Sequence, residues 1–142
     1  MRVGINGMGR IGRLALRAAM GAAERQPDDP RAGNRLDVVH LNEIKGGAAA
    51  TAHLLAFDSV QGRWREDIAV EADDRIRLGS RQLSFSSHAT AAEIPWGDLG
   101  VDVVLECTGK FNDRDKAAVH LGRGAKRVLV SAPAKRAAKT VV

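Results

Sequence analysis

The sequence predicts an α/β fold: a doubly wound, mostly parallel sheet with an inserted antiparallel meander. Within residues 1–42, a short apolar strand, a glycine-rich turn, a helix and a second strand follow one another. Residues 101–131 repeat the alternation of strand, helix and strand. Such alternation gives parallel strands joined by right-handed crossovers, with helices on both faces. Between these units, residues 66–86 hold short alternating pieces separated by Asp-Asp and Gly-Ser, a pattern typical of antiparallel strands.

The opening strand is expected at residues 1–6 and the first helix at about residues 10–23. Apolar side chains recur at helical spacing, so one face of this helix should pack on the sheet. The expected apolar face holds Ile11, Leu14, Ala15, Ala18 and Ala19, and the opposite face holds Arg13 and Arg17. The polar segment 24–34 contains two prolines and is expected as a loop, after which a strand at 36–41 completes a βαβ unit.

A helix is expected at 48–55, a turn at 57–62 and the antiparallel pieces at 68–85, and residues 94–97 end this region. A strand at 101–106, a helix capped by Asn112 or Asp113 and running to Leu121, and a strand at 127–131 follow. Residues 139–142 have the pattern of a strand that has only begun. An unpaired apolar strand is an exposed edge that domains avoid. We therefore expect residues 1–142 to form one domain that is truncated at its C-terminal end.

Composition is that of an ordinary globular domain, with 44% hydrophobic and 27% charged residues. No apolar run approaches the length of a membrane span, and the first residues have the pattern of a strand instead of a signal peptide. Cys107 is the single cysteine, so no disulfide can form within the chain. These features predict a soluble, cytoplasmic protein that binds no membrane.

The net charge of +5 raises the question of nucleic-acid binding. The arginines are scattered from Arg2 to Arg136 without a dense stripe, and two tryptophans and three phenylalanines are few for base stacking. An electropositive surface also suits an anionic dinucleotide or a phosphorylated substrate, but a solvated, arginine-biased surface is the favoured explanation of the excess. A nucleic-acid binder is therefore the third choice, after an enzyme and a bare binding module.

The stretch Gly7-Met8-Gly9-Arg10-Ile11-Gly12 joins the expected first strand to the first helix. This G-x-G-x-x-G spacing is typical of Rossmann dinucleotide-binding loops, because each glycine meets a different steric need. Gly7 permits the tight turn, Gly9 lets a pyrophosphate approach the backbone, and Gly12 lets the helix pack closely. The helix then points its free N–H groups and positive dipole end at the pyrophosphate. The alternative is an ordinary strand–turn–helix that binds no ligand.

An acidic residue follows the second strand, in the pair Asn42-Glu43. A carboxylate at this place accepts hydrogen bonds from both ribose hydroxyls of adenosine and repels a 2′-phosphate, which favours NAD over NADP. Glu43 lies further from the glycines than usual, and the proline-containing loop accounts for the difference. The alternative is an exposed glutamate at a strand end, and the nearby Lys45 weakens the discrimination between the two dinucleotides.

No catalytic residue and no metal site are expected in this chain. The four histidines, at 40, 53, 88 and 120, are scattered, with neither metal-ligand spacing nor a constellation of partners. Cys107 is interpreted as a small residue at a strand end, not as a nucleophile.

Five blocks, in this order along nearly the whole chain, resemble the phosphorylating glyceraldehyde-3-phosphate dehydrogenase family. They are Ile5-Asn6-Gly7-Met8-Gly9-Arg10-Ile11-Gly12-Arg13, Phe57-Asp58-Ser59-Val60-Gln61-Gly62, Ile94-Pro95-Trp96-Gly97, Glu106-Cys107-Thr108-Gly109-Lys110-Phe111 and the segment from Gly124 to Pro133. The resemblance implies a Rossmann domain over residues 1–142, with the catalytic domain absent, and NAD as its cofactor. The residues that it places at the cofactor are Asn6, Gly7, Gly9, Arg10, Ile11, Gly12, Asn42, Glu43, Cys107, Thr108, Gly109 and Ser131.

In this resemblance the glycine loop holds the pyrophosphate and Glu43 the ribose, where the family more often has aspartate. The Cys107-Thr108-Gly109 turn passes near the adenosine half, and Ser131 lies near the nicotinamide end. The chain departs from the family in its longer loop after the first helix. A basic residue that the family often places before the Ile-Pro-Trp-Gly block is not evident at residues 86–89.

The family's chemistry uses a cysteine nucleophile in a Ser-Cys-Thr-Thr-Asn context and a histidine base beyond it. Neither is present, since Cys107 stands in a Glu-Cys-Thr-Gly context. The resemblance therefore implies the NAD-binding portion of an enzyme that oxidises glyceraldehyde 3-phosphate, with NAD and phosphate, to an acyl phosphate, and that assembles as a homotetramer. Residues 42–47 and 51–55 also resemble an arsenate-resistance-associated branch, which would use arsenate in place of phosphate. The alternative is a non-catalytic NAD-binding fragment.

Overall fold

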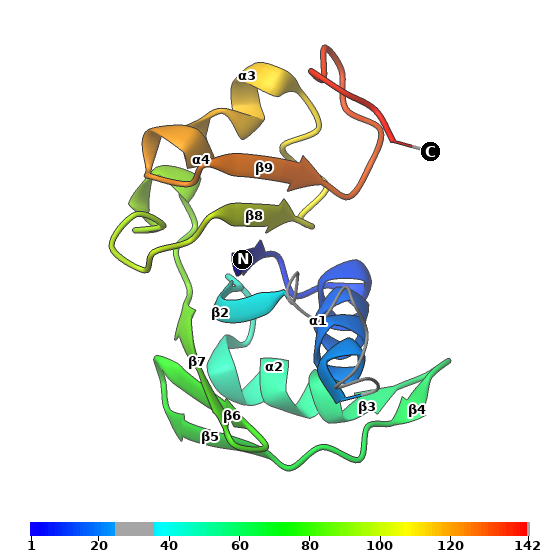
Figure 1. The fold of residues 1–142 in the computed structure, drawn as a ribbon. Coiled ribbons are helices and arrows are strands. Elements are labelled where there is room, and N and C mark those ends of the chain that lie inside the picture. Colours follow the sequence, from blue (N-terminus) through cyan, green and yellow to red (C-terminus); the bar gives the residue numbers. More distant parts are fainter. Residues whose placement is uncertain (25–35, 142) are drawn as a thin grey trace.

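A seven-stranded sheet organises the computed structural model, which describes residues 1–24 and 36–141 (Figure 1). The strand order is β5-β6-β7-β2-β1-β8-β9. The strands are β1 (Arg2–Asn6), β2 (Asp37–Asn42), β5 (Ile68–Ala72), β6 (Arg75–Leu78), β7 (Arg81–Ser86), β8 (Val103–Glu106) and β9 (Arg127–Val130). The five strands from β7 to β9 in this order pair in parallel, and β5 and β6 pair antiparallel. The predicted α/β class and the antiparallel meander are confirmed, and the meander continues the main sheet through β7.

The helices are α1 (Arg10–Glu24), α2 (Gly47–Ala56), α3 (Arg114–Ala117) and α4 (Val119–Gly122), with a 3₁₀ turn at Ala91–Glu93. The short strands β3 (Phe57–Asp58) and β4 (Gly62–Arg63) pair as a hairpin where a turn was expected. Figure 1 shows α1 and α2 gathered around β2 and the meander, whereas α3 and α4 lie beside β8 and β9. Within the described part of the chain, no helix has the length and apolar character needed to cross a membrane.

Two cores form because successive side chains of a strand point to opposite faces. Ile5 belongs to a core that contains the buried side chains of α1, α2 and the meander. Val104 belongs to a second core on the other face, around Ile94 and Trp96. Trp96 is fully buried, and its indole ring lies so close to β1 that a Cβ atom at Gly4 would overlap it. The absent side chain of Gly4 thus gives the indole its place on the sheet.

The buried stripe of α1 differs from the one that the sequence predicted. The helix buries Gly12, Leu16 and Met20, while the Ile11 side chain is 52% exposed. Apolar spacing alone chose the wrong stripe, because it gave no weight to Gly12, the one position where α1 can approach the Gly7 carbonyl oxygen. Arg13 and Arg17, predicted on the solvated face, are half-buried, and Arg17 donates to the Leu55 carbonyl oxygen at 2.6 Å.

The C-terminal elements also differ in detail from expectation. The Asp113 carboxylate caps α3 by accepting from the Asp115 N–H at 3.0 Å, as predicted, but the helix breaks at Ala118 into α3 and α4. No strand forms over residues 139–141, and Val142 lies outside the described residues. The reason is visible at Lys135, whose backbone pairs with residues 112–114 at the start of α3, which leads the chain away from the edge of β9. The loop expected at 24–34 lies outside the described residues, apart from Glu24, which ends α1.

Candidate functional site

The carboxyl ends of β1, β2 and β8 bring most of the predicted site residues together. The three strands are neighbours and run in the same direction, so Asn6, Asn42 and Glu106 end them side by side. In Figure 1 this edge lies on the side toward which the arrows of β8 and β9 point. In open α/β sheets ligands bind outside this edge, where loops and helix N-termini converge.

Gly7 and Gly12 of the loop after β1 each meet a steric need in the structure, whereas Gly9 leaves open space. Gly7 has a φ of 92°, and its N–H donates to the Asn42 carbonyl oxygen at 2.9 Å. A Cβ atom on Gly7 would lie 2.8 Å from the Thr108 nitrogen, and one on Gly12 would overlap the Gly7 carbonyl oxygen. Gly9 is exposed, and no atom lies within 4 Å of the place its Cβ would take. The backbone at Gly9 is therefore open to a ligand, while Gly7 and Gly12 hold the turn closed.

The N-terminus of α1 faces this opening. The first backbone hydrogen bond of the helix joins the Arg13 N–H to the Gly9 carbonyl oxygen at 3.0 Å, so the amides of Arg10, Ile11 and Gly12 precede the helical ladder. Such amides and the helix dipole favour an anion. The Arg10 guanidinium turns away, donating to the Ser59 hydroxyl at 3.1 Å. Arg10 and Ile11 thus offer backbone amides to this site.

Glu43 closes the second side of the loop. One oxygen of its carboxylate accepts from the Met8 N–H at 2.8 Å, and the other accepts from the Lys45 N–H at 2.9 Å. The half-buried carboxylate therefore lies against the glycine loop, and its contact with a ribose remains a prediction. A carboxylate has about four acceptor positions, so two are left for ribose hydroxyls.

The turn after β8 forms the third side. The Cys107 N–H donates to the Asn6 carbonyl oxygen at 2.8 Å, and the Ser131 N–H donates to the Glu106 carbonyl oxygen at 3.0 Å. Burial raises the pKa of the Cys107 thiol, the neighbouring Glu106 charge raises it further, and a hydrogen bond with the Ser131 hydroxyl opposes both. A nucleophilic cysteine needs a lowered pKa, so this thiol has the opposite environment. Thr108 is half-buried, and Gly109 and Ser131 are exposed at this edge.

Asn6 and Asn42 turn their side chains inward. The Asn42 amide donates to the Asn6 side-chain oxygen at 2.9 Å and to the His88 carbonyl oxygen at 3.1 Å. The Asn42 oxygen accepts from the Ser86 hydroxyl at 2.7 Å and the His88 N–H at 2.9 Å. Both asparagines are at most 4% exposed. Their direct contact with a cofactor remains a prediction, and their visible role is to tie β1, β2 and the end of β7 together.

The sequence reasoning missed the buried pair of Glu106 and His120. Their side chains are 1% and 0% exposed, with 3.0 Å between the His120 Nε2 and Glu106 Oε2 atoms. The expectation that no histidine has a constellation of partners was therefore wrong for His120. One signal was available, because a glutamate in an otherwise apolar strand requires a buried partner.

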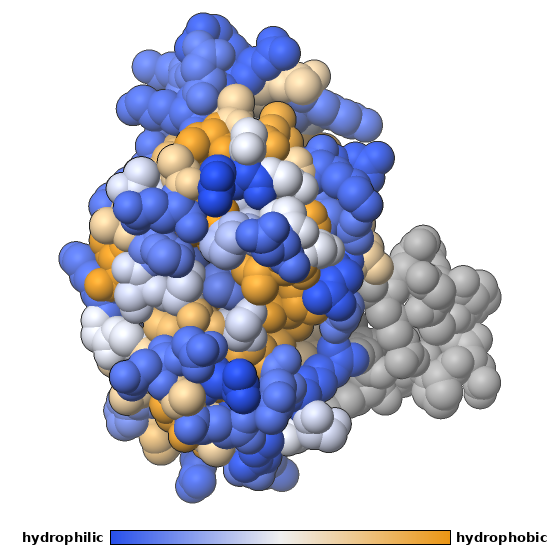
Figure 2. Space-filling model, turned by 90° about the vertical axis from the view of Figure 1, so that its left-hand side faces the viewer, coloured by the Kyte–Doolittle hydropathy of each residue, from blue (hydrophilic) through white to orange (hydrophobic). Residues whose placement is uncertain are grey.

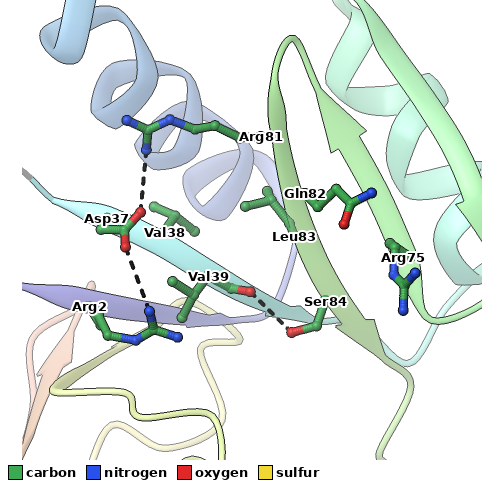
Figure 3. A pocket seen from close by; sticks show the side chains of 9 residues that line it. All are labelled: Arg2, Asp37, Val38, Val39, Arg75, Arg81, Gln82, Leu83 and Ser84. Carbon is green, nitrogen blue, oxygen red and sulfur yellow. Dashed lines mark hydrogen bonds and ion pairs between the residues drawn. The ribbon is translucent and has the colours of Figure 1, made fainter.

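A pocket lies at the opposite edge of the sheet. It has a volume of about 550 Å³ and is lined by Arg2, Asp37, Val38, Val39, Arg75, Arg81, Gln82, Leu83 and Ser84 (Figure 3). Figure 3 shows the Arg2 and Arg81 guanidinium groups approaching the Asp37 carboxylate from two sides. Figure 2, which views the molecule from the amino ends of β8 and β9, shows apolar surface there surrounded by hydrophilic side chains. This pocket contains none of the residues of the glycine loop.

Among the described residues, no group of three or more His, Cys, Asp or Glu side chains is arranged to hold a metal ion. The family model described as "Glyceraldehyde 3-phosphate dehydrogenase, NAD binding domain" matches residues 1–114.

Three curated relatives match over all 142 residues of this chain. They are glyceraldehyde-3-phosphate dehydrogenase 3 of Nostoc sp., 47% identical, glyceraldehyde-3-phosphate dehydrogenase 1 of Streptomyces avermitilis, 46% identical, and glyceraldehyde-3-phosphate dehydrogenase of Pseudomonas aeruginosa, 45% identical. The chain spans 39 to 40% of the length of these relatives. It matches the family's NAD-binding part, and NAD is the cofactor of that domain. The chain therefore belongs to the family of glyceraldehyde 3-phosphate dehydrogenase NAD-binding domains.

Proposed function

We propose that this chain supplies the NAD site of an enzyme that oxidises glyceraldehyde 3-phosphate, with phosphate, to an acyl phosphate. The observation that carries the proposal is the arrangement at the glycine loop. Gly9 is open to a ligand, the N-terminus of α1 faces it, and the Glu43 carboxylate is held 2.8 Å from the Met8 nitrogen. A glycine loop open to the pyrophosphate, a helix N-terminus and a ribose-binding acid are the three parts of a dinucleotide site.

Different residues of the site bind different parts of the cofactor. The free amides of Arg10, Ile11 and Gly12, beside the open backbone at Gly9, bind the pyrophosphate. Glu43 binds the adenosine ribose, and the Thr108 turn borders the adenosine half. Ser131, exposed after β9, lies toward the nicotinamide end. When bound, the nicotinamide supplies the hydride acceptor, and the chain's own contribution is binding and orientation.

The reaction itself requires residues beyond these 142. Cys107 is the single cysteine of the sequence, and its half-buried thiol, whose pKa is raised, is unsuited to attack an aldehyde. We propose that residues 1–142 form a dinucleotide-binding domain and that the nucleophile is supplied by a catalytic domain outside these residues. A homotetrameric, cytoplasmic enzyme with phosphate as the acyl acceptor completes the proposal, and use of arsenate in place of phosphate is the alternative.

The test is to titrate the 142-residue chain with NAD by calorimetry and to assay NADH formation with glyceraldehyde 3-phosphate and either phosphate or arsenate. We expect weak NAD binding and no NADH with either anion. Absence of NAD binding by the folded chain would contradict the proposed site. NADH formation that persists in Cys107→Ser would reveal another nucleophile, and formation abolished by this substitution would assign that role to Cys107.

A further inference from the structure

Glu106 carries a buried negative charge that the proposed cofactor contacts do not use. Its side chain is 1% exposed at the end of β8. One oxygen, Oε2, accepts from the Asn6 amide at 2.6 Å and from His120 at 3.0 Å. The other, Oε1, accepts from the Thr108 N–H at 2.7 Å and from the Thr108 hydroxyl. Four donors converge on two oxygens, so the carboxylate is ionised and fully occupied by hydrogen bonds.

A hydrogen bond on the side of His120 opposite Glu106 fixes the tautomer of the ring. The Trp96 indole N–H, which can only donate, lies 3.0 Å from the His120 Nδ1 atom. Nδ1 must therefore accept, so the proton of the neutral ring is on Nε2 and points at Glu106. The His120 and Trp96 side chains are fully buried. This side of the network can only donate toward the carboxylate.

A second chain of hydrogen bonds reaches Glu106 along the strand ends. The Ser86 hydroxyl donates its one hydrogen to the Asn42 oxygen, so it accepts from the His40 Nε2 atom, 2.9 Å away. The Asn42 amide donates to the Asn6 oxygen, and the Asn6 amide donates to Glu106. Every donor in this chain points the same way. Hydrogen bonds aligned in this manner polarise one another in a buried site.

The charge is connected to the glycine loop at two points. Asn6 immediately precedes Gly7, and the Thr108 backbone lies so close to Gly7 that a Cβ atom there would be 2.8 Å from the Thr108 nitrogen. Glu106 fixes both neighbours of that turn, Asn6 through its amide and Thr108 through its N–H and hydroxyl. A shift of either would change the width of the opening at Gly9.

We infer that Glu106 is the positioning residue of the NAD site: its carboxylate holds the Asn6 and Thr108 sides of the glycine loop at the separation that the pyrophosphate requires. This inference rests on the assignment of NAD to this edge. Glu106 touches no cofactor atom itself and acts through Asn6 and Thr108. Glu106→Gln keeps the shape but replaces one acceptor oxygen with an NH₂ donor, so one pair of donors loses its partner.

The test compares the unaltered 142-residue chain with Glu106→Gln and with the control Glu71→Gln. Glu71 also accepts a hydrogen bond, from Gln82 at 2.8 Å, but it lies on β5, away from the site. We expect Glu106→Gln to bind NAD at least about tenfold more weakly, and Glu71→Gln to bind it within about twofold of the unaltered chain. The Thr108 N–H donates to the Glu106 carboxylate, so its proton resonance should shift upfield in Glu106→Gln but not in Glu71→Gln. This resonance reports the local hydrogen bond separately from global stability.

A second pair of variants covers the case in which Glu106→Gln fails to fold. Thr108→Val removes one donor to Glu106 and leaves the other three in place, and we expect NAD affinity to fall about threefold. Thr108→Ser retains the hydroxyl and should restore the affinity. NAD binding by folded Glu106→Gln or by Thr108→Val equal to that of the unaltered chain would overturn the inference alone. Failure of the unaltered chain to bind NAD would overturn the proposed function and, with it, the inference.

Discussion

The two ends of the parallel strands differ in how they treat charge. At the carboxyl edge, Asn6, Asn42 and Glu106 are buried and bonded to one another in a continuous network. At the amino edge, Asp37 is half-exposed and lies 3.4 Å from Arg81 and 4.0 Å from Arg2. Buried polar groups must be satisfied in one arrangement, whereas exposed ion pairs rearrange at little cost in free energy. The edge with fixed geometry is the one that carries the glycine loop, and the pocket at the other edge has no such framework.

The strongest way to break the carboxyl edge is Gly12→Ala. The added Cβ would overlap the Gly7 carbonyl oxygen, a backbone atom that cannot move without opening the turn. We expect the free energy of unfolding to fall by about 3 kcal/mol or more and NAD binding to be lost by calorimetry.

Gly9→Ala is the matched control for this substitution. No atom lies within 4 Å of its added Cβ, so the melting temperature should stay within about 2 °C while NAD affinity falls, because the methyl group enters the space of the pyrophosphate. Equal stability of Gly12→Ala and Gly9→Ala would contradict the assigned role of Gly12.

The second largest effect on stability is expected from acid acting on the buried network. Burial and, to a smaller extent, the charge of the nearby His88 together lower the pKa of His40 to about 4. Since the unfolded chain takes up this proton near pH 6.5, stability is complete above that pH, falls as the pH drops from 6.5 to 4, and levels below 4 as far as His40 is concerned. The loss amounts to about 3 kcal/mol. Denaturant unfolding across this range measures it, and His40→Gln should flatten the slope. An unchanged slope in that variant would contradict the assignment.

The sequence predicts the parts of the site whose causes are local. Gly7 makes the positive-φ turn, Gly9 leaves the backbone open, and Gly12 packs on the Gly7 carbonyl oxygen, so their spacing identifies the loop. Glu106 and His120 escaped prediction because their contact spans 14 residues and depends on how β8 and α4 pack.

The same distinction explains the errors in the fold. Periodicity located α1 correctly but chose the wrong stripe, because hydropathy treats Gly12 as neutral although it determines the approach of the helix. A strand at 139–142 would need a distant partner strand. Instead, Lys135, which precedes this segment, forms backbone hydrogen bonds with residues 112 and 114. Local stereochemistry can be read from sequence, whereas competition between distant partners cannot.

The choice between NAD and NADP tests the role of the Glu43 carboxylate at the carboxyl edge. The Glu43 carboxylate would lie beside the 2′-phosphate of NADP, and like charges in a half-buried site repel. We expect NAD to bind more tightly than NADP, and Glu43→Gln to narrow the ratio of the two dissociation constants by about tenfold. Parallel titrations with both dinucleotides measure the ratio, and Glu71→Gln serves as control. Equal or tighter NADP binding by the unaltered chain would mean that Lys45 or another cation dominates the site.

The smallest effect is expected at the amino edge, from Arg81→Gln. The Arg81 and Asp37 side chains are 36% and 50% exposed and 3.4 Å apart, so water and salt screen their attraction. Removing the guanidinium leaves Asp37 facing water and Arg2, and Arg2 keeps its own hydrogen bond to the Leu99 carbonyl oxygen at 3.0 Å. The free energy of unfolding should change by less than about 0.5 kcal/mol, and NAD affinity should not change. Denaturant unfolding at low and high salt measures this. A loss above about 1 kcal/mol would show that the amino edge is as rigidly organised as the carboxyl edge, since only a fixed geometry lets an exposed pair contribute that much.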